Sequence, residues 1–112
     1  MAKDLYWVGR SLEDLRAFPD DARRGAGHAL HLVQLGLDPE DWRPMPSVGA
    51  GVVELRVRGV TEHRVFYVAK FVEAIYVLHA FEKKTQRTAQ SDIELGRARF
   101  KEVMRWRRER GK

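Results

Sequence analysis

Residues 52–81, VVELRVRGVTEHRVFYVAKFVEAIYVLHAF, predict the central part of a β-sheet. Apolar and charged residues alternate over 52–58, and this period of two is typical of a strand with one buried face. The segments 63–70 and 74–81 are apolar on both faces, as central strands covered on two sides are. Because the connections between the three segments are short, we expect neighbouring strands to be antiparallel.

Two helices are predicted before these strands. The first begins at Ser11, whose hydroxyl can cap an early backbone N–H, and ends at Pro19. The second opens on Asp20 and carries apolar residues at helical spacing up to Gly36, its expected C-terminal cap. Since a single proline separates the two helices, we expect a helical hairpin lying on the sheet. The short apolar run 5–8 predicts one further strand.

The segment 37–51 is rich in proline and glycine and shows neither helical nor strand periodicity, so it predicts a long loop. We expect Trp42 to anchor this loop to the core. A final helix runs to about Arg110, and either Thr88 or Ser91 is placed to cap its start. The order of elements predicts an α+β fold: a small antiparallel sheet with an N-terminal helical hairpin and a C-terminal helix.

The chain has 112 residues, a length that fits one domain spanning 1–112. It contains no cysteine, which excludes thiol nucleophiles, disulfides, iron–sulfur clusters and cysteine-type zinc sites. No stretch approaches the length of apolar sequence that a membrane span needs, and the first ten residues lack the apolar core of a signal peptide. We therefore expect a cytoplasmic protein that does not contact a membrane.

The positive charge is concentrated in the second half of the chain. Residues 1–48 carry six Lys and Arg against eight Asp and Glu, whereas residues 49–112 carry fifteen against eight. The last sixteen residues, from Arg97 onward, hold eight basic side chains and two acidic ones. This asymmetry favours a polyanionic or acidic partner, although a solvated, arginine-rich helix face produces the same pattern.

Most motifs that carry enzyme chemistry are missing from the sequence. It has no P-loop, no GxGxxG phosphate cradle and no GxSxG nucleophile elbow. His28 and His31 stand three residues apart on the second predicted helix, a spacing that can ligate a metal. Without an HExxH motif, a solvated helix face is the better interpretation, and we expect neither a metal nor a cofactor.

A set of cations on or beside the predicted sheet is the remaining candidate site: Arg56, Arg58, Arg64, Lys83 and Lys84. Cleaving an RNA phosphodiester without a metal requires a base for the 2′-OH, fixed cations for the phosphorane and an acid for the leaving oxygen. Arginine suits the second task, and lysine, histidine or tyrosine the other two. Tyr67 and His79 are close in sequence, and strand parity predicts both on the face opposite Arg64. In such a pattern, an arginine on an exposed strand face or a histidine on an apolar face is more often structural than catalytic.

Three blocks of this sequence resemble a known family: Val53 to Arg56, Arg64 to Tyr67, and Val77 to Thr88, which contains the run LHAFEKKTQRT. They are similar to the phage-derived, HigB-like branch of the RelE/ParE superfamily of type II toxin–antitoxin toxins. The resemblance extends over nearly the whole chain. Two departures are Ala89, where relatives often have proline, and Gly96, where alanine is common. Gly96 either permits close packing or weakens the helix by roughly 1 kcal/mol.

The resemblance implies a RelE/ParE-like fold and a growth-inhibiting toxin that cleaves mRNA on the translating ribosome. It also implies a co-expressed antitoxin, often a helix-turn-helix protein through which alone the toxin reaches DNA. Carried onto this chain, it makes Arg56 and Arg64 the phosphate and transition-state cations, with Lys83, Tyr67 and His79 as candidates for proton transfer. The expected RNA-binding residues are Arg58, Lys83, Lys84 and Arg87.

Two other functions stay open at the level of sequence. ParE-like relatives inhibit DNA gyrase without cleaving anything, and they share the fold, so fold alone does not distinguish them. A degenerate toxin that acts only inside a repressor complex is the other possibility. In that case the basic C-terminal helix binds an acidic segment of the antitoxin.

Overall fold

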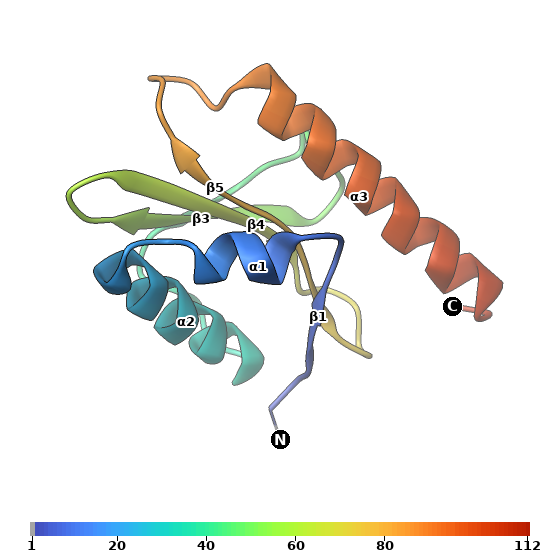
Figure 1. Cartoon of the computed structure of the whole chain (residues 1–112). Coiled ribbons are helices and arrows are strands. Elements are labelled where there is room, and N and C mark those ends of the chain that lie inside the picture. The colour runs from blue at the N-terminus through green and yellow to red at the C-terminus, as the bar shows by residue number, and fades with distance from the viewer. Residues whose placement is uncertain (1) are drawn as a thin grey trace.

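The computed structural model describes residues 2–112 as a five-stranded sheet with helices on both faces (Figure 1). The strands are β1 (Leu5–Trp7), β2 (Trp42–Pro44), β3 (Val52–Arg58), β4 (Glu62–Val68) and β5 (Ile75–Lys83). The helices are α1 (Ser11–Arg16), α2 (Asp20–Gln34) and α3 (Gln90–Glu109). The strand order is β1-β5-β4-β3-β2, so the three strands predicted from residues 52–81 lie at the centre.

The central strands confirm the predicted antiparallel pairing. β3 has the predicted bounds, and β4 and β5 begin and end within about two residues of theirs. β3 pairs antiparallel with β4, and β4 pairs antiparallel with β5. The short connections leave no other arrangement, since a parallel neighbour needs a long crossover.

The prediction of a purely antiparallel sheet is wrong, because β1 lies parallel to β5 at one edge. Leu5 pairs with Ile75 and Trp7 with Val77. The two strands are far apart in the chain, because α1, α2 and the strands β2 to β4 lie between them in sequence. A three-residue strand carries no local signal for its direction, so its orientation follows from where the rest of the fold leaves an open edge.

The segment 37–51 is not entirely a loop, because β2 adds a short strand to the opposite edge of the sheet. Its Pro44 has no N–H to donate, which an edge strand tolerates. Trp42 does not anchor the segment, as it is 40% exposed. Met45 and Val48 are buried in its place and hold the segment against the core below α3.

The N-terminal helices are present, but a helical hairpin is not confirmed. α1 packs mainly against β5 and α2 mainly against β3, and the two helices make little contact with each other. The hydroxyl of Ser11 does not cap α1; it is buried and donates to the carbonyl of Val77 at 3.0 Å. Likewise α3 begins after Ala89 without a side-chain cap, so neither Thr88 nor Ser91 has the predicted role.

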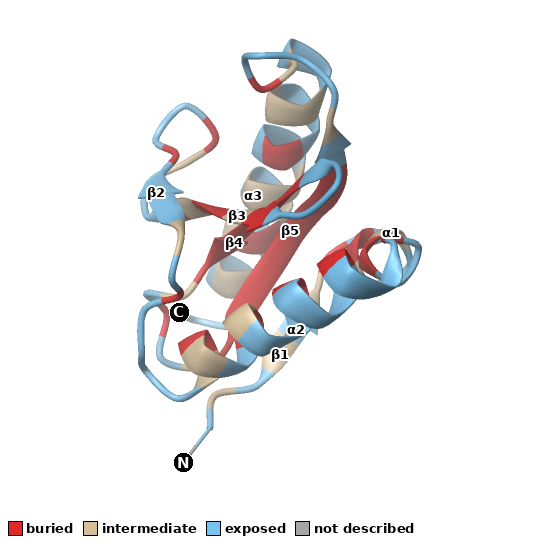
Figure 2. Ribbon diagram, turned by 90° about the vertical axis from the view of Figure 1, so that its left-hand side faces the viewer, coloured by how far each residue is buried: buried red, intermediate tan, exposed pale blue. Residues whose placement is uncertain are grey.

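The sheet separates two hydrophobic cores (Figure 2). One lies under α1 and α2, and the other lies under α3. Gly96 of α3 sits against the second core, where an added Cβ would come within 2.9 Å of Phe66 and 3.0 Å of Val48. Close packing, rather than a weakened helix, therefore accounts for this glycine. Within residues 2–112 no helix has the length and apolar character that crossing a membrane requires.

Candidate functional site

The predicted cations of the sheet meet on its α3 side. Arg56 of β3 stands directly opposite Arg64 of β4, and Lys83 of β5 stands opposite Glu62 at the end of β4. Paired residues of antiparallel strands project to the same face, so these side chains share one surface. The alternation of β3 puts Glu54 on the same face, two residues before Arg56.

Glu54 is the centre of this group, and sequence reasoning did not single it out. Its side chain is fully buried, and its Oε1 lies 2.8 Å from Arg43 Nε. The Nε atoms of Arg56 and Arg64 lie 3.8 Å and 3.7 Å from the same oxygen. The second oxygen accepts a hydrogen bond from Thr88 at 2.9 Å. A buried carboxylate needs such partners, because an unpaired charge is costly away from water.

We call Glu54 and its three arginines, Arg43, Arg56 and Arg64, the Glu54 cluster. One carboxylate cannot satisfy three guanidinium groups. The Nε atoms of Arg56 and Arg64 are buried and have no hydrogen-bond partner among the described residues. The cluster therefore retains unused donors and more positive than negative charge.

The two arginines that the sequence singled out differ in access to solvent. The side chain of Arg64 is only 3% exposed, and its Nη2 donates to Glu62 at 2.8 Å. This hydrogen bond holds the pKa of Glu62 below its usual value. The side chain of Arg56 is 26% exposed, and its nearest carboxylate other than Glu54 is Asp41 at 3.9 Å. Arg56 can therefore meet a ligand, whereas Arg64 supports the cluster from inside.

A cavity of about 370 Å³ lies beside Arg56, between α2 and β3. Arg56, Arg58 and Asp41 are among its lining residues, and Arg58 Nε lies 2.9 Å from Asp41 Oδ2. Its size is in the range of small-molecule sites. Exposed His28 also lines it, while Arg64 and Lys83 do not.

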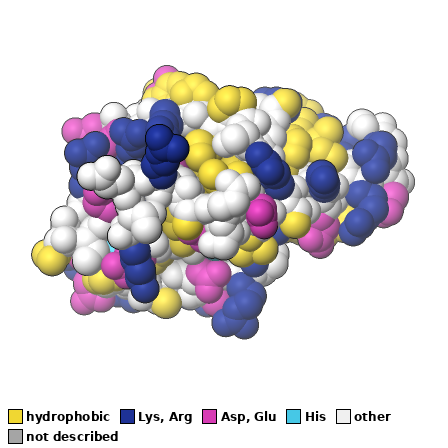
Figure 3. Space-filling view, turned by 90° about the horizontal axis from the view of Figure 1, so that it is seen from above, with side chains coloured by type: hydrophobic (Ala, Val, Ile, Leu, Met, Phe, Trp, Pro, Cys, Tyr) yellow, Lys and Arg dark blue, Asp and Glu magenta, His cyan; other side chains and the backbone are white. Residues whose placement is uncertain are grey.

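The segment 84–89 carries further cations to the edge of the Glu54 cluster. Lys84 and Arg87 are exposed there, and Lys83 Nζ donates to a carbonyl of the segment at 2.6 Å. Thr88 ties the segment to β3 through Glu54. Seen from above, Lys and Arg side chains lie toward both ends of the molecule, with acidic groups near them (Figure 3).

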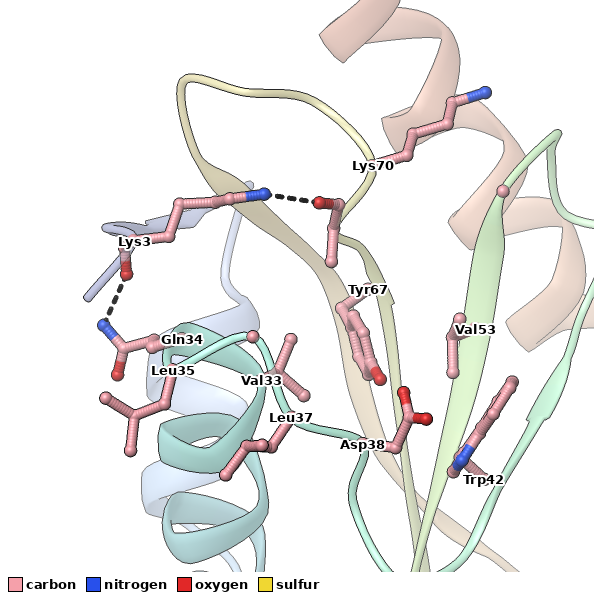
Figure 4. A pocket seen from close by; sticks show the side chains of 13 residues that line it. Lys3, Val33, Gln34, Leu35, Leu37, Asp38, Trp42, Val53, Tyr67 and Lys70 are labelled. Atoms are coloured by element: carbon pink, nitrogen blue, oxygen red, sulfur yellow. Dashed lines mark hydrogen bonds between the residues drawn. The ribbon is translucent and has the colours of Figure 1, made fainter. Parts of the chain in front are cut away.

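Tyr67 lies on the opposite side of the sheet, as strand parity predicted. It lines a cavity of about 520 Å³ beside the C-terminal end of α2. Figure 4 shows its hydroxyl extending toward Asp38, with Trp42 at the rim. Burial, with a smaller effect from Asp38, raises the pKa of Tyr67 to about 12. The sheet therefore separates this phenol from the Glu54 cluster.

His79 is on the same face as Arg64, so its predicted placement on the opposite face is wrong. The register of β4 and β5 shifts between Phe66 and Tyr67, which leaves Leu78 unpaired and reverses the parity. The ring of His79 is buried and stacks on Phe81 with 4.6 Å between centroids. Its Nε2 lies 2.8 Å from Asp92 Oδ1 of α3, and burial lowers its pKa despite this carboxylate.

One family model matches residues 13–101, which include β2 to β5 and the whole Glu54 cluster. Its description is "Phage derived protein Gp49-like (DUF891)". No curated protein matches the chain.

Proposed function

Because the chain belongs to the Gp49-like family of phage-derived proteins, a RelE/ParE-like toxin family of toxin–antitoxin systems, we propose that it is a toxin that cleaves mRNA. Cleavage takes place on the translating ribosome, stops protein synthesis and is prevented by a cognate antitoxin of the helix-turn-helix type. The observation that supports this proposal is the Glu54 cluster, where three guanidinium groups share one buried carboxylate.

The reaction uses the 2′-OH of the RNA itself. The 2′-oxygen loses its proton and bonds to phosphorus, while the bond from phosphorus to the 5′-oxygen breaks and that oxygen gains a proton. The products are a cyclic phosphate end and a 5′-hydroxyl end. Fixed cations accelerate this step by stabilising the charge that builds up on the phosphorane oxygens.

Each cation of the site has a distinct role in this scheme. Arg56 contacts the phosphorane oxygens, because its side chain is 26% exposed and a guanidinium can donate to two phosphate oxygens at once. Arg64 keeps Glu54 and Arg56 in position from inside the sheet. Lys83 assists proton transfer to the leaving oxygen, and Arg58, Lys84 and Arg87 bind the flanking phosphates. Tyr67 and His79 receive no step, since one lies across the sheet and the other is enclosed by Phe81 and Asp92.

Mapping mRNA ends after incubation with translating ribosomes tests the proposal. The wild-type protein is expected to produce new 5′ ends within coding sequence, and Arg56→Ala to abolish them. Arg16→Ala is the matched control, because Arg16 is exposed on α1 and remote from the cluster. Intact message at a dose that arrests growth contradicts the proposal.

One observation favours gyrase inhibition as a second candidate function. The side chains best suited to acid–base work, Tyr67 and His79, are not beside Arg56. A protein that only binds needs no such groups. In cells that express the protein, DNA damage without translation arrest identifies this second function, and translation arrest without DNA damage identifies mRNA cleavage.

A further inference from the structure

The outer face of α3 carries a row of cations that the Glu54 cluster does not use. We define the α3 stripe as Arg97, Lys101, Arg105 and Arg108. Successive α-helical residues are about 100° apart, so this spacing keeps all four side chains within about 80° of the helix circumference. At about 1.5 Å per residue the stripe is about 16 Å long.

All four side chains of the α3 stripe point away from the core. Each is exposed, whereas Gly96 and Val103 of the same helix are buried. Looking down on the molecule, Lys and Arg side chains recur toward the right-hand end, where α3 ends (Figures 1 and 3).

The other arginines of α3 point inward to internal partners, whereas in the stripe only Arg97 has one, because its Nε donates to the carbonyl of Ser47. Arg107 is paired with Glu73 at 2.6 Å, and Arg99 donates to the carbonyl of Leu78 at 2.8 Å. Among residues 2–112 no carboxylate forms an ion pair with any member of the stripe. This holds even though Glu102 and Glu109 are three and four residues from Arg105, a spacing at which such pairs form. The stripe thus contributes no salt bridge to the fold.

The chemistry of the α3 stripe suits a phosphate backbone better than an acidic protein segment. Arginine makes bidentate contacts with phosphate, and a row of cations neutralises a row of phosphates without reading sequence. Protein interfaces depend instead on large apolar anchors. Within Gln90–Glu109 the one large apolar side chain that is exposed is Leu95, at 38%, and it lies outside the arc of the stripe.

We propose that the α3 stripe docks the phosphate backbone of a structured RNA, at a surface separate from the Glu54 cluster. The proposal rests on the proposed function in taking RNA as the partner. Docking there raises the local concentration of the RNA and holds it while a single-stranded segment reaches Arg56. Such binding is independent of sequence and weakens steeply with salt.

Binding of an RNA hairpin that carries 2′-O-methyl groups tests the α3 stripe without cleavage, because the methyl group blocks attack by the 2′-oxygen. Fluorescence anisotropy over a range of salt concentrations compares the wild type with the triple variant Lys101→Gln, Arg105→Gln, Arg108→Gln. The triple variant is expected to bind about tenfold or more weakly at low salt. Its log–log salt slope should be smaller by about 2 to 3, since each lost phosphate contact removes about 0.9.

The matched control loses the same charge elsewhere. Arg10→Gln, Arg16→Gln, Arg24→Gln changes exposed residues in and just before α1 and α2, and its salt slope should stay within about 1 of the wild-type value. The double variant Arg105→Lys, Arg108→Lys keeps the charges and should retain most of the affinity. Circular dichroism and thermal unfolding establish that each variant is folded.

Three results overturn the inference: a triple variant that binds like the wild type, a control that loses as much affinity, or stripe-dependent binding of a poly-glutamate peptide but not of the hairpin. The proposed cleavage fails separately. If the hairpin binds through the stripe while ribosomal mRNA stays intact, the docking surface stands and the nuclease proposal is wrong. If mRNA is cut and the triple variant binds the hairpin as tightly as the wild type does, the nuclease proposal is supported and the proposed docking surface is wrong.

Discussion

Two glutamates of this protein meet arginines in different ways. Glu73, in the connection between β4 and β5, has one arginine partner: Arg107 Nε of α3 lies 2.6 Å from its Oε2, which also accepts a hydrogen bond from the Tyr76 hydroxyl at 2.9 Å. The guanidinium of Arg107 also stacks over the Phe71 ring, 3.6 Å from its centroid. Glu54, fully buried in β3, has three partners at 2.8, 3.7 and 3.8 Å from one oxygen.

The number of arginine partners decides what each glutamate does. At Glu73 one negative charge meets one positive charge, and the pair fastens the C-terminal half of α3 to the β4–β5 connection. At Glu54 three arginines share one buried carboxylate, and two of them reach a second carboxylate as well: Arg64 meets Glu62 at 2.8 Å and Arg56 lies 3.9 Å from Asp41. The pair at Glu73 supports the fold, whereas the Glu54 cluster also holds the guanidinium of Arg56, which is 26% exposed, in a fixed position.

The largest expected effect comes from Glu54→Gln, which keeps the size of the side chain but removes the charge that the three arginines share. We expect a loss of about 3–5 kcal/mol in the free energy of unfolding, because buried guanidinium groups then lack a counter-charge. Urea unfolding measures it. Glu73→Gln is the control and should cost clearly less; equal unfolding midpoints for the two variants contradict the distinction between the sites.

Removing single arginines tests whether Arg64 supports the cluster and Arg56 contacts the ligand. Arg64→Ala should lower the free energy of unfolding by about 1–3 kcal/mol, since it removes a buried cation from beside Glu54 and the hydrogen bond to Glu62. Arg56→Ala should change stability by only about 0.5 kcal/mol. Both should abolish mRNA cleavage in the ribosome assay. An Arg56→Ala protein that cleaves normally removes this residue from the site.

Thr88 links the Glu54 cluster to the segment that carries Lys84 and Arg87. Thr88→Val removes the hydroxyl that donates to Glu54 and should cost about 1–2 kcal/mol. Amide hydrogen exchange in the segment 84–89 should become faster. Thr88→Ser restores a donor and is expected to recover most of the protection, whereas equal exchange in the two variants shows that the hydrogen bond does not order the segment.

The dependence on pH that Glu73 introduces is confined to acid solution. The hydrogen bond from Arg107 lowers the pKa of Glu73 from about 4.5 to about 2. A carboxyl whose pKa is lower in the folded state stabilises the protein above its unfolded pKa, and this contribution is lost as the pH falls through the folded pKa. The melting temperature of the wild type should therefore approach that of Glu73→Gln between about pH 4.5 and pH 2. A constant difference over this window contradicts the pairing.

Local pattern was sufficient for the elements that are long and regular. The alternation in β3, the apolar runs of β4 and β5 and the helical spacing of α2 and α3 each repeat several times within one segment. It predicted a strand at β1 but not its parallel direction, and it missed β2; each of these strands has three residues. A period cannot be recognised in so few residues, and whether such a segment pairs depends on the open edges of a sheet formed elsewhere in the chain.

The candidate site divides in the same way. Strand parity and the family resemblance predicted that Arg56 would be a central cation of the site, and the pairing of β3 with β4 brings Arg64 beside it. The role of Glu54 was not predictable, because its partners come from β2, β4 and a segment 34 positions along the chain. His79 was misplaced because the irregular pairing of β4 with β5 shifts the register, which nothing in the sequence signals.

The order of residues along this chain was thus enough to establish the central strands, the three helices, the excess of cations and the family. The fold alone established which cations share a carboxylate, which of them reach solvent and on which side of the sheet Tyr67 and His79 lie. The reason is the separation in sequence over which each effect acts. Periodicity and propensity act between neighbours in sequence, whereas charge balance and burial depend on distances between residues that meet only when the sheet has formed.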